Sequence, residues 1–274
     1  MKKVTGNLRK MKTILASPVE YYFRIGEQEI FLNDLLGKNI SLAFTGVINC
    51  IQCGRKTNKS FQQGYCYPCM QRLNECNNCA IFPERCKVEE GGCPEDDWAH
   101  AHCHAKQIVY LANSSGLKVG ITRESHVPMR WIDQGAIQAI PIFKANNRYQ
   151  CGLMEVAIKQ NVSDRTNWRA MLKNDVNKLD LLQERDRLLL EANLAVQSVL
   201  DKTAGGVVAI EQADVVDIEY PVLQYPQKIT SLSLDKTPEI SAVLQGIKGQ
   251  YLILDAGVLN IRKFGGYEVG CSFG

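Results

Sequence analysis

Alternating hydrophobic and polar residues indicate that both ends of the 274-residue chain are rich in β-structure. Near the N-terminus this alternation predicts three strands, at 19–25, 29–32 and 40–44. Residues 207–274 return to the same pattern, as in 251–254 and 258–261. Neither end is long enough to close a barrel by itself. We therefore expect an N-terminal and a C-terminal β-unit that pair with each other.

The region from Gln107 to Gly205 mixes strand and helix patterns. It predicts a strand–turn–strand unit, a helix, a third strand and a second helix, at 108–112, 117–121, 128–136, 139–143 and 149–160. A longer apolar stripe at helical spacing follows, so we expect one continuous helix over about 175–200, ended by Gly205 and Gly206.

Between these regions, residues 49–105 lose all periodicity and hold nine of the eleven cysteines. The first four form two C-x-x-C knuckles, Cys50 with Cys53 and Cys66 with Cys69. Each knuckle can present two thiolates to one ion, and two knuckles complete a tetrahedral shell. The spacing predicts a structural zinc site.

The remaining cysteines of the segment form a less regular group, comprising Cys76, Cys79, Cys86, Cys93 and Cys103. His102 and His104 flank the last of them, so five thiols and two imidazoles compete for four places. We expect Cys76 and Cys79 to act together in a second zinc site, with the other two ligands open among Cys86, Cys93 and Cys103. An iron–sulfur cluster is the alternative, because it also takes four thiolates.

The metal sites change the meaning of the formal net charge of +3. A four-thiolate zinc site carries a net charge of −2, so two sites bring the chain to about −1. Any binding of a polyanion must then use local patches. Candidate patches are Arg55-Lys56 with Lys59, Lys118 with Arg123 and Arg130, and Arg262-Lys263. For any single one of these residues, a solvated surface charge is the simpler interpretation.

The N-terminal segment carries charges at Lys2, Lys3, Arg9, Lys10 and Lys12, which leaves no apolar core for a signal peptide. No run of eighteen uncharged apolar residues predicts a membrane span. We therefore expect a cytoplasmic protein without a membrane partner. In that reducing compartment, clustered cysteines are more often metal ligands than disulfides.

Long stretches of the chain resemble a family of uncharacterised microbial zinc-binding proteins. The resemblance rests on the segments 50–69, 117–123, 130–136, 164–169 and 246–252. These motifs include C-G-R-K-T, G-Y-C-Y-P-C, K-V-G-I-T-R, R-W-I-D-Q-G-A and G-I-K-G-Q-Y-L. Because the family has no known function, this resemblance implies zinc binding and no particular activity.

The region after Gln107 also resembles the GIY-YIG endonuclease superfamily, on a strand–turn–strand with I-V-Y and K-V-G, a following arginine and a glutamate on a later helix. The resemblance implies that Tyr110, Arg130 and Glu155 form a phosphodiester-cleaving site, with Mg²⁺ at Glu155. Two positions depart from the pattern, because Ile108 replaces a glycine and Lys118 replaces the second tyrosine. Lysine can bind a phosphate but lacks the phenol's hydrogen bonding, which puts cleavage in doubt. The alternative interpretation is non-functional: Tyr110 is an ordinary aromatic residue of a strand, and Arg130 and Glu155 are surface charges.

The segment 164–169, D-R-T-N-W-R, has two interpretations. Trp168 flanked by arginine is suited to stacking on a nucleotide base. Alternatively, Asp164 or Thr166 caps a helix while Trp168 packs inward. We favour Thr166 as the cap and leave the role of Trp168 open.

Together these features predict an α+β protein with a zinc-knuckle module and a GIY-YIG-like three-stranded α/β core, flanked by the two β-units. The expected boundaries are 1–48, 49–105, 106–205 and 206–274. The expected function is nucleic-acid binding, with RNA (tRNA or ribosome-associated) slightly preferred over DNA. The expected contacts are Arg55, Lys56, Lys118, Arg123 and Trp168. A Mg²⁺-dependent endonuclease and a protein-interaction scaffold remain the alternatives.

Overall fold

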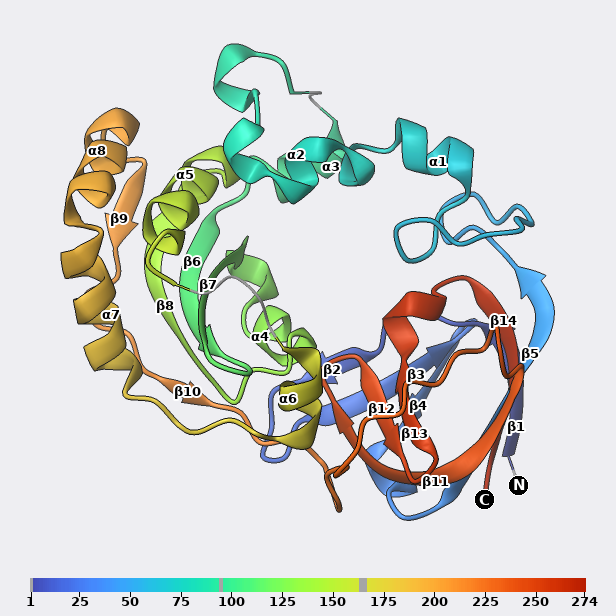
Figure 1. The fold of residues 1–274 in the computed structure, drawn as a ribbon. Coiled ribbons are helices and arrows are strands. Elements are labelled where there is room, and N and C mark those ends of the chain that lie inside the picture. The colour runs from blue at the N-terminus through green and yellow to red at the C-terminus, as the bar shows by residue number, and fades with distance from the viewer. Residues whose placement is uncertain (1, 94–95, 163–166) are drawn as a thin grey trace.

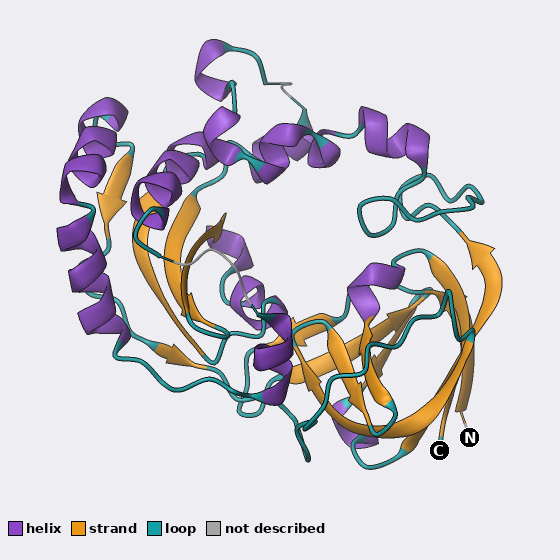
Figure 2. Ribbon diagram, in the orientation of Figure 1, coloured by secondary structure: helices purple, strands orange, loops and turns teal. Residues whose placement is uncertain are grey.

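The computed structural model describes residues 2–93, 96–162 and 167–274. It is a mixed α+β fold with three antiparallel sheets (Figure 1). Figure 2 shows most helices gathered around one sheet and along an arch above it, while the other two sheets lie together.

The largest sheet joins the two ends of the chain. Its six strands run in the order β1-β14-β5-β11-β12-β13. Their bounds are Lys2–Asn7 (β1), Tyr267–Phe273 (β14), Asn39–Ile48 (β5), Glu239–Lys248 (β11), Tyr251–Leu254 (β12) and Gly257–Asn260 (β13). Cys271 of β14 lies opposite Val4 of β1 and Leu42 of β5. The expected pairing between the N- and C-terminal β-units is therefore present, and it produces one shared sheet.

A smaller sheet of three strands packs against the large one. It consists of β2 (Lys12–Ile14), β3 (Glu20–Ile25) and β4 (Gln28–Phe31), with β3 in the middle. Alternate residues of β3, Tyr21, Phe23 and Ile25, are buried. They belong to the same hydrophobic cluster as Leu42 and Val269 of the large sheet. The alternation read from the sequence thus marks the face that enters the common core.

The third sheet has five strands, and we call it the core sheet. Four of them run in the order β10-β8-β6-β7, and β9 also pairs with β8. The bounds are Gln107–Asn113 (β6), Leu117–Arg123 (β7), Gln138–Ala145 (β8), Val207–Ala209 (β9) and Val216–Asp217 (β10). Every residue of β6 is buried. Val109 and Leu111 face a cluster formed with the helices, whereas Tyr110 and Ala112 face Trp131 and the other two sheets. This alternation fixes the side of the sheet on which Tyr110 lies.

Helices cover both faces of the core sheet. Those after residue 106 are α4 (Met129–Asp133), α5 (Arg148–Lys159), α6 (Trp168–Lys173), α7 (Leu181–Glu191) and α8 (Asn193–Thr203). The single helix expected over 175–200 is wrong in two respects. It begins only at Leu181, where Asp180 accepts a hydrogen bond from the Gln183 backbone, and it is interrupted at Ala192. Strands β9 and β10 both pair with β8, so the core sheet extends beyond the boundary that we expected at residue 205.

The cysteine-rich segment contains only short helices. These are α1 (Tyr67–Arg72), α2 (Asn78–Ile81) and α3 (Asp97–His102). Single 3₁₀ turns complete the chain, at Asn33–Leu35 (η1), Asn74–Cys76 (η2), Pro83–Arg85 (η3), Val88–Glu90 (η4), Glu124–His126 (η5) and Ile261–Phe264 (η6). In Figure 1 the described part of this segment, 49–93 and 96–105, forms an arch from the end of β5 to the core sheet. We call this part of the chain the arch.

Two close contacts dock the cysteine-rich arch on α5. The Arg148 backbone N–H donates to the Cys103 carbonyl at 2.8 Å. At Gly152, a Cβ atom would lie 2.8 Å from the Glu84 nitrogen, so only glycine admits this approach. The arch is thereby held above one side of the core sheet. Within the described part of the chain, no helix combines the length and apolarity needed to span a membrane.

Candidate metal centre and basic pocket

The two cysteine knuckles meet as the sequence predicts. The sulfur atoms of Cys50, Cys53, Cys66 and Cys69 all lie within 4.8 Å of one another, and Cys53 Sγ is 3.8 Å from Cys66 Sγ. Thiolates at about 2.3 Å from a tetrahedral zinc ion are themselves about 3.8 Å apart. Gly54, in the left-handed region at φ 72°, allows the first knuckle to turn. The cluster can hold a metal ion such as zinc.

Backbone N–H groups near this cluster stabilise the negative charge of the Cys50 sulfur. Burial alone would raise the pKa of the Cys50 thiol, but backbone N–H groups of Cys53, Cys66 and Gln52 donate to its sulfur and lower its pKa to about 6. Thiolates are the form that binds zinc. These donors favour the thiolate at Cys50, whereas burial and the neighbouring sulfur atoms raise the pKa of Cys69 to about 12. A bound cation would offset the repulsion among four thiolates.

The second cysteine group is not gathered in the same way. Among the described residues, the two knuckles are the one group close enough to hold a metal as they stand. Burial raises the pKa of Cys76, and the charges of Glu75 and of Cys50, a member of the first cluster, raise it further. Burial raises the pKa of Cys103 to about 12, and the thiolates of Cys93, Cys86 and Cys79 contribute. The expected pairing of Cys76 with Cys79 in a second metal site stays a prediction.

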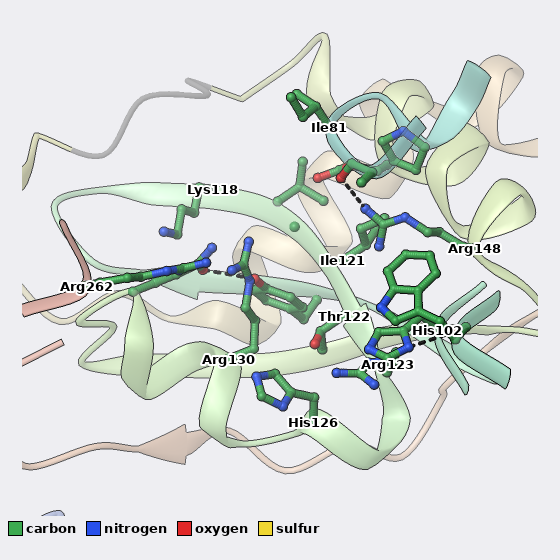
Figure 3. A pocket seen from close by; sticks show the side chains of 18 residues that line it. Ile81, His102, Lys118, Ile121, Thr122, Arg123, His126, Arg130, Arg148 and Arg262 are labelled. Atoms are coloured by element: carbon green, nitrogen blue, oxygen red, sulfur yellow. Dashed lines mark hydrogen bonds between the residues drawn. The ribbon is translucent and has the colours of Figure 1, made fainter. Parts of the chain in front are cut away.

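A basic pocket of about 560 Å³ lies between the arch and the core sheet (Figure 3). We use "basic pocket" for the cavity whose polar and aromatic lining is Trp98, His102, Tyr110, Lys118, Thr122, Arg123, His126, Arg130, Gln134, Arg148, Glu155 and Arg262. The arch supplies Trp98 and His102, and the η6 turn supplies Arg262. The other lining residues, from Tyr110 to Glu155, come from the segment between β6 and α5. Residues from three distant parts of the sequence therefore share one cavity.

The pocket brings together Tyr110, Arg130 and Glu155, the three residues expected to act as a catalytic set. They come from β6, α4 and α5. Two of the expected nucleic-acid contacts, Lys118 and Arg123, line the same cavity. The other three do not. Arg55 and Lys56 are exposed on the knuckle loop, and Trp168 packs elsewhere.

Tyr110 is the buried centre of the set. Its hydroxyl donates to Gln134 Oε1 at 2.9 Å, and its ring meets Trp131 edge-on. Burial raises the pKa of the phenol, the Arg130 guanidinium opposes this rise, and the Glu155 carboxylate adds to it. At neutral pH the hydroxyl therefore stays protonated and acts as a hydrogen-bonding group between a cation and a carboxylate.

Gly120 makes room for this phenol, because it lies opposite Tyr110 in the β6–β7 pair. A Cβ atom at Gly120 would be 2.7 Å from the Tyr110 hydroxyl oxygen. We expect Gly120→Ala to displace the ring and to lower the free energy of unfolding by about 1–3 kcal/mol, as overpacking in a filled core does. Denaturant unfolding measures this loss. The matched control is Gly270→Ala in β14, where the nearest atom would be 3.8 Å away. Equal stabilities for the two variants would contradict the contact.

The charges in the pocket are strongly unbalanced. Five cations, Lys118, Arg123, Arg130, Arg148 and Arg262, surround Glu155, the one carboxylate among the described lining residues. None of the four arginines forms an ion pair with a described carboxylate. Burial lowers the pKa of Arg123, and the charge of Arg148 lowers it further. Burial and the charge of Arg130 also lower the pKa of Arg262, while the carboxylate of Asp133 partly opposes this shift. Such an arrangement favours an anion.

His126 reaches the pocket from the η5 turn and has a buried partner behind it. Its Nε2 lies 3.8 Å from Asp133 Oδ2. Asp133 also pairs with Lys10 and accepts a hydrogen bond from Gln250 Nε2 at 2.9 Å. His126 and the two further partners offset the burial of Asp133 and hold the pKa of its carboxyl below the usual value. This network ties the N- and C-terminal strands to the floor of the pocket.

Sequence reasoning missed several residues of the pocket. Arg148 and Trp98 carried no motif, and Arg262 stood out only as part of a surface patch. Arg148 begins α5 and donates to the Ala80 carbonyl at 2.7 Å, so it belongs to both the arch and the pocket. No local signal could have found these residues, because strand pairing and the docking of the arch bring them together.

Trp168 begins α6 outside the pocket. Its ring stacks on Tyr251, with centroids 5.9 Å apart and planes 4° from parallel, and Arg169 lies over it at 4.4 Å. The helix cap is Asn167, whose side chain accepts from Arg169 and Ala170. Asp164 and Thr166, the caps we expected, lie outside the described residues. The inward packing of Trp168 agrees with the capping interpretation of this segment.

Lys248 is fully buried, away from the basic pocket. Its Nζ donates to Asn174 Oδ1 at 2.8 Å and lies over the rings of Tyr220 and Tyr225. Burial lowers the pKa of this amine to about 8. Below pH 8 the amine is protonated in both states, so the folded protein bears the full cost of burying the charge.

This cost predicts a pH-dependent effect of Lys248→Met. At pH 7 the variant should be more stable than the wild type by about 2 kcal/mol. Between pH 8 and about 10 the folded wild type releases the proton while its unfolded chain keeps it, so the wild type gains stability and the difference shrinks. Denaturant unfolding at pH 7 and pH 9.5 measures this. A difference that does not change with pH would contradict a charged buried lysine.

The fold and the cysteine cluster define a mixed α+β protein with a candidate four-cysteine metal centre. A family model, "Protein of unknown function (DUF2797)", matches residues 37–269. The chain belongs to this family, and the expected membership of a family of unknown function is confirmed. Neither the curated proteins nor the solved structures include a match to the chain.

Proposed function

We propose that this protein binds nucleic acid through the basic pocket, with RNA preferred over DNA. The observation that carries the proposal is the set of four arginines that line one cavity without an ion pair to any described carboxylate. Guanidinium groups bind phosphates through paired N–H donors. Burial and a neighbouring guanidinium disfavour the charged form of Arg123 and of Arg262, and a polyanion would offset both effects.

A second cavity extends the positive surface beyond the pocket. It measures about 300 Å³ and shares Arg262 with the basic pocket. Arg9, Lys10 and Arg24 also line it. Lys10 pairs with Asp133 and Arg24 with Glu29, so Arg9 and Arg262 supply most of its unbalanced charge. The continuity supports a ligand longer than a single phosphate.

Titration against salt tests this proposal. Fluorescent tRNA, single-stranded RNA and duplex DNA are titrated with zinc-loaded protein at 50 to 300 mM salt. Phosphate contacts release counterions, so the logarithm of the affinity should fall steeply with the logarithm of salt concentration. Absent or salt-insensitive binding to all three would refute the proposal. Purified protein that carries a bound protein and no nucleic acid would favour the interaction scaffold.

We propose further that the core is GIY-YIG-like. Supporting this, β6 lies between β7 and β8, and α4 and α5 follow β7 and β8 in the chain. Tyr110, Arg130 and Glu155 then meet in the pocket. This convergence favours a second candidate function, metal-dependent cleavage of a phosphodiester, because it places a cation, a hydroxyl and a carboxylate around one space.

The residues present fit a magnesium ion that binds together with substrate. Mg²⁺ is commonly held by one or two carboxylates plus substrate phosphates, with water completing its shell. Glu155 would hold it, and the ion would supply charge stabilisation at the phosphate. Arg130 stabilises the developing negative charge and Tyr110 orients the attacking water. Hydrolysis adds water across one P–O bond, and the leaving sugar oxygen takes up a proton.

Cleavage is tested with the same labelled RNA and DNA in Mg²⁺ or Mn²⁺. We expect Glu155→Gln to abolish cleavage while binding persists or rises, because the variant removes the metal ligand, which is the one carboxylate among the described lining residues. Denaturing gels report the products. If the wild type cleaves nothing with either metal, the enzyme hypothesis is rejected and the binding proposal stands.

We also propose a second zinc ion. Its ligands would be Cys79, Cys86, Cys93 and Cys103, since the charges of the first three act on Cys103 while Cys76 lies toward Cys50. Elemental analysis of purified protein should then give two zinc ions per chain. Cys76→Ser should leave that number unchanged and Cys79→Ser should lower it by one. A single zinc in the wild type would refute this proposal.

A further inference from the structure

The arch contributes an aromatic wall to the basic pocket. Trp98 and His102, both on α3, stack with ring centroids 4.4 Å apart and planes 9° from parallel. The His102 Nδ1–H donates to the Trp98 carbonyl at 2.8 Å, which fixes the imidazole against the indole. Both side chains are half-buried and line the cavity, beside the exposed Ile81. Nothing in phosphate binding alone requires an aromatic stack at this place.

The cations of the pocket fall into two groups at its two ends. The charges of Arg130 and Arg262 repel each other at one end, where Figure 3 also shows Lys118. Arg123 and Arg148 do so at the other, next to His102 (Figure 3). The floor between them is formed by β7, with Gly120, Ile121 and Thr122. The cavity thus has two cationic ends and an aromatic wall.

We infer that the pocket holds one unpaired nucleotide of a single strand, with its base against Trp98 and its two flanking phosphates at the two arginine pairs. The inference rests on the proposed nucleic-acid binding and names the substrate class. Bases stack on aromatic side chains in sequence-tolerant single-strand sites, and phosphates bind in adjacent positive grooves. A base inside a duplex has both faces covered by its neighbours and its edge paired, so it has no free face for Trp98.

The size of the cavity and the fixed position of its wall support the same substrate. A volume of about 560 Å³ lies within the range of sites that enclose one small ligand. The arch is docked on α5 through Gly152 and Arg148, so the wall opposite β7 is fixed in place. A double helix would contact the rim of the cavity, whereas an unpaired nucleotide can enter it.

The test measures the affinity of zinc-loaded protein for a 12-nucleotide single-stranded RNA and for the same sequence as a blunt duplex. We expect Trp98→Ala to weaken single-strand binding about 10- to 100-fold, as loss of one stacking platform does. Duplex binding should change less than about two-fold, because the arginines that bind phosphate remain. Trp98→Phe keeps an aromatic ring and should restore most of the single-strand affinity. Trp168→Ala is the matched control, because Trp168 stacks on Tyr251 outside the pocket.

Intrinsic fluorescence provides a second readout that does not depend on affinity. The chain has three tryptophans, and Trp131 is buried. Single-stranded RNA should quench the emission of the wild type and of Trp168→Phe, but not that of Trp98→Phe. Equal losses of single-strand and duplex affinity in Trp98→Ala, or no loss, would overturn the inference while leaving nucleic-acid binding intact. Absence of wild-type binding to either RNA would refute the proposed function, and the inference with it.

Discussion

A Cys66→Ser variant is expected to lose the metal of the four-cysteine cluster and on the order of 5 kcal/mol of stability. Metal binding to such sites contributes about 10–16 kcal/mol in isolated zinc-finger peptides, and part of that energy is already spent in folding them. Apart from its contacts with α5, the arch depends on this cluster, because it has no apolar core of its own. Among the described residues, the three hydrophobic clusters include no member between Ile48 and Ile108. We therefore expect the arch to unfold when the metal is removed.

Elemental analysis and thermal unfolding measure this effect. Cys271→Ala is the matched control, because Cys271 is equally buried but lies in β14 of the large sheet. The control should keep its zinc and lose only what a small buried side chain contributes, about 1 kcal/mol. A Cys66→Ser protein with full zinc content and wild-type stability would show that the cluster is not a metal centre.

The second large effect is expected from the paired replacement Arg130→Gln and Arg262→Gln. Removing two phosphate contacts should weaken nucleic-acid binding about 100-fold near physiological salt and reduce the salt slope by about 2. Stability should change by less than about 1 kcal/mol, because repulsion between the two guanidinium groups offsets the attraction of Arg262 to Asp133. Loss of binding without loss of stability is the signature of a binding site.

Two controls make this result specific. Arg187→Gln alters an exposed arginine on α7, which is not part of the pocket. Arg55→Gln alters the knuckle loop that the sequence suggested as a contact. Neither should change affinity more than about two-fold. An equal loss in Arg55→Gln would place the interface on the knuckle, and unchanged affinity in the double variant would remove the pocket from the binding surface.

Sequence patterns predicted those parts of the fold that depend on short-range order. Sequence patterns located β3, β5, β6 and β7 to within a few residues. Alternate residues of β3 are buried, whereas β6 is buried throughout and reads as a continuous apolar run. The expected long helix was wrong because its pattern is nearly continuous, while the observed break is a local change at Ala192. Pairing of β9 with β8 was also outside reach, since a three-residue strand carries no periodic signal.

The candidate site divides in the same way. The knuckle spacing predicted the four-cysteine cluster because the ligands lie close together in sequence. Tyr110, Arg130 and Glu155 could be named only through a resemblance, and they stand together because β6, α4 and α5 enclose one space. Trp98 and Arg262 required the docked arch and the shared sheet. Where side chains meet across distant segments, spacing along the chain gives no information about the meeting.

The most direct measurement of where nucleic acid binds is photocrosslinking with position mapping. Zinc-loaded protein is bound to single-stranded RNA containing 4-thiouridine, irradiated and digested, and the crosslinked peptides are identified by mass spectrometry. The account predicts crosslinks to peptides that contain Trp98 on the arch and to residues 110–123 of the core sheet. Crosslinks confined to the knuckle loop around Arg55, or to α7 and α8, would contradict it.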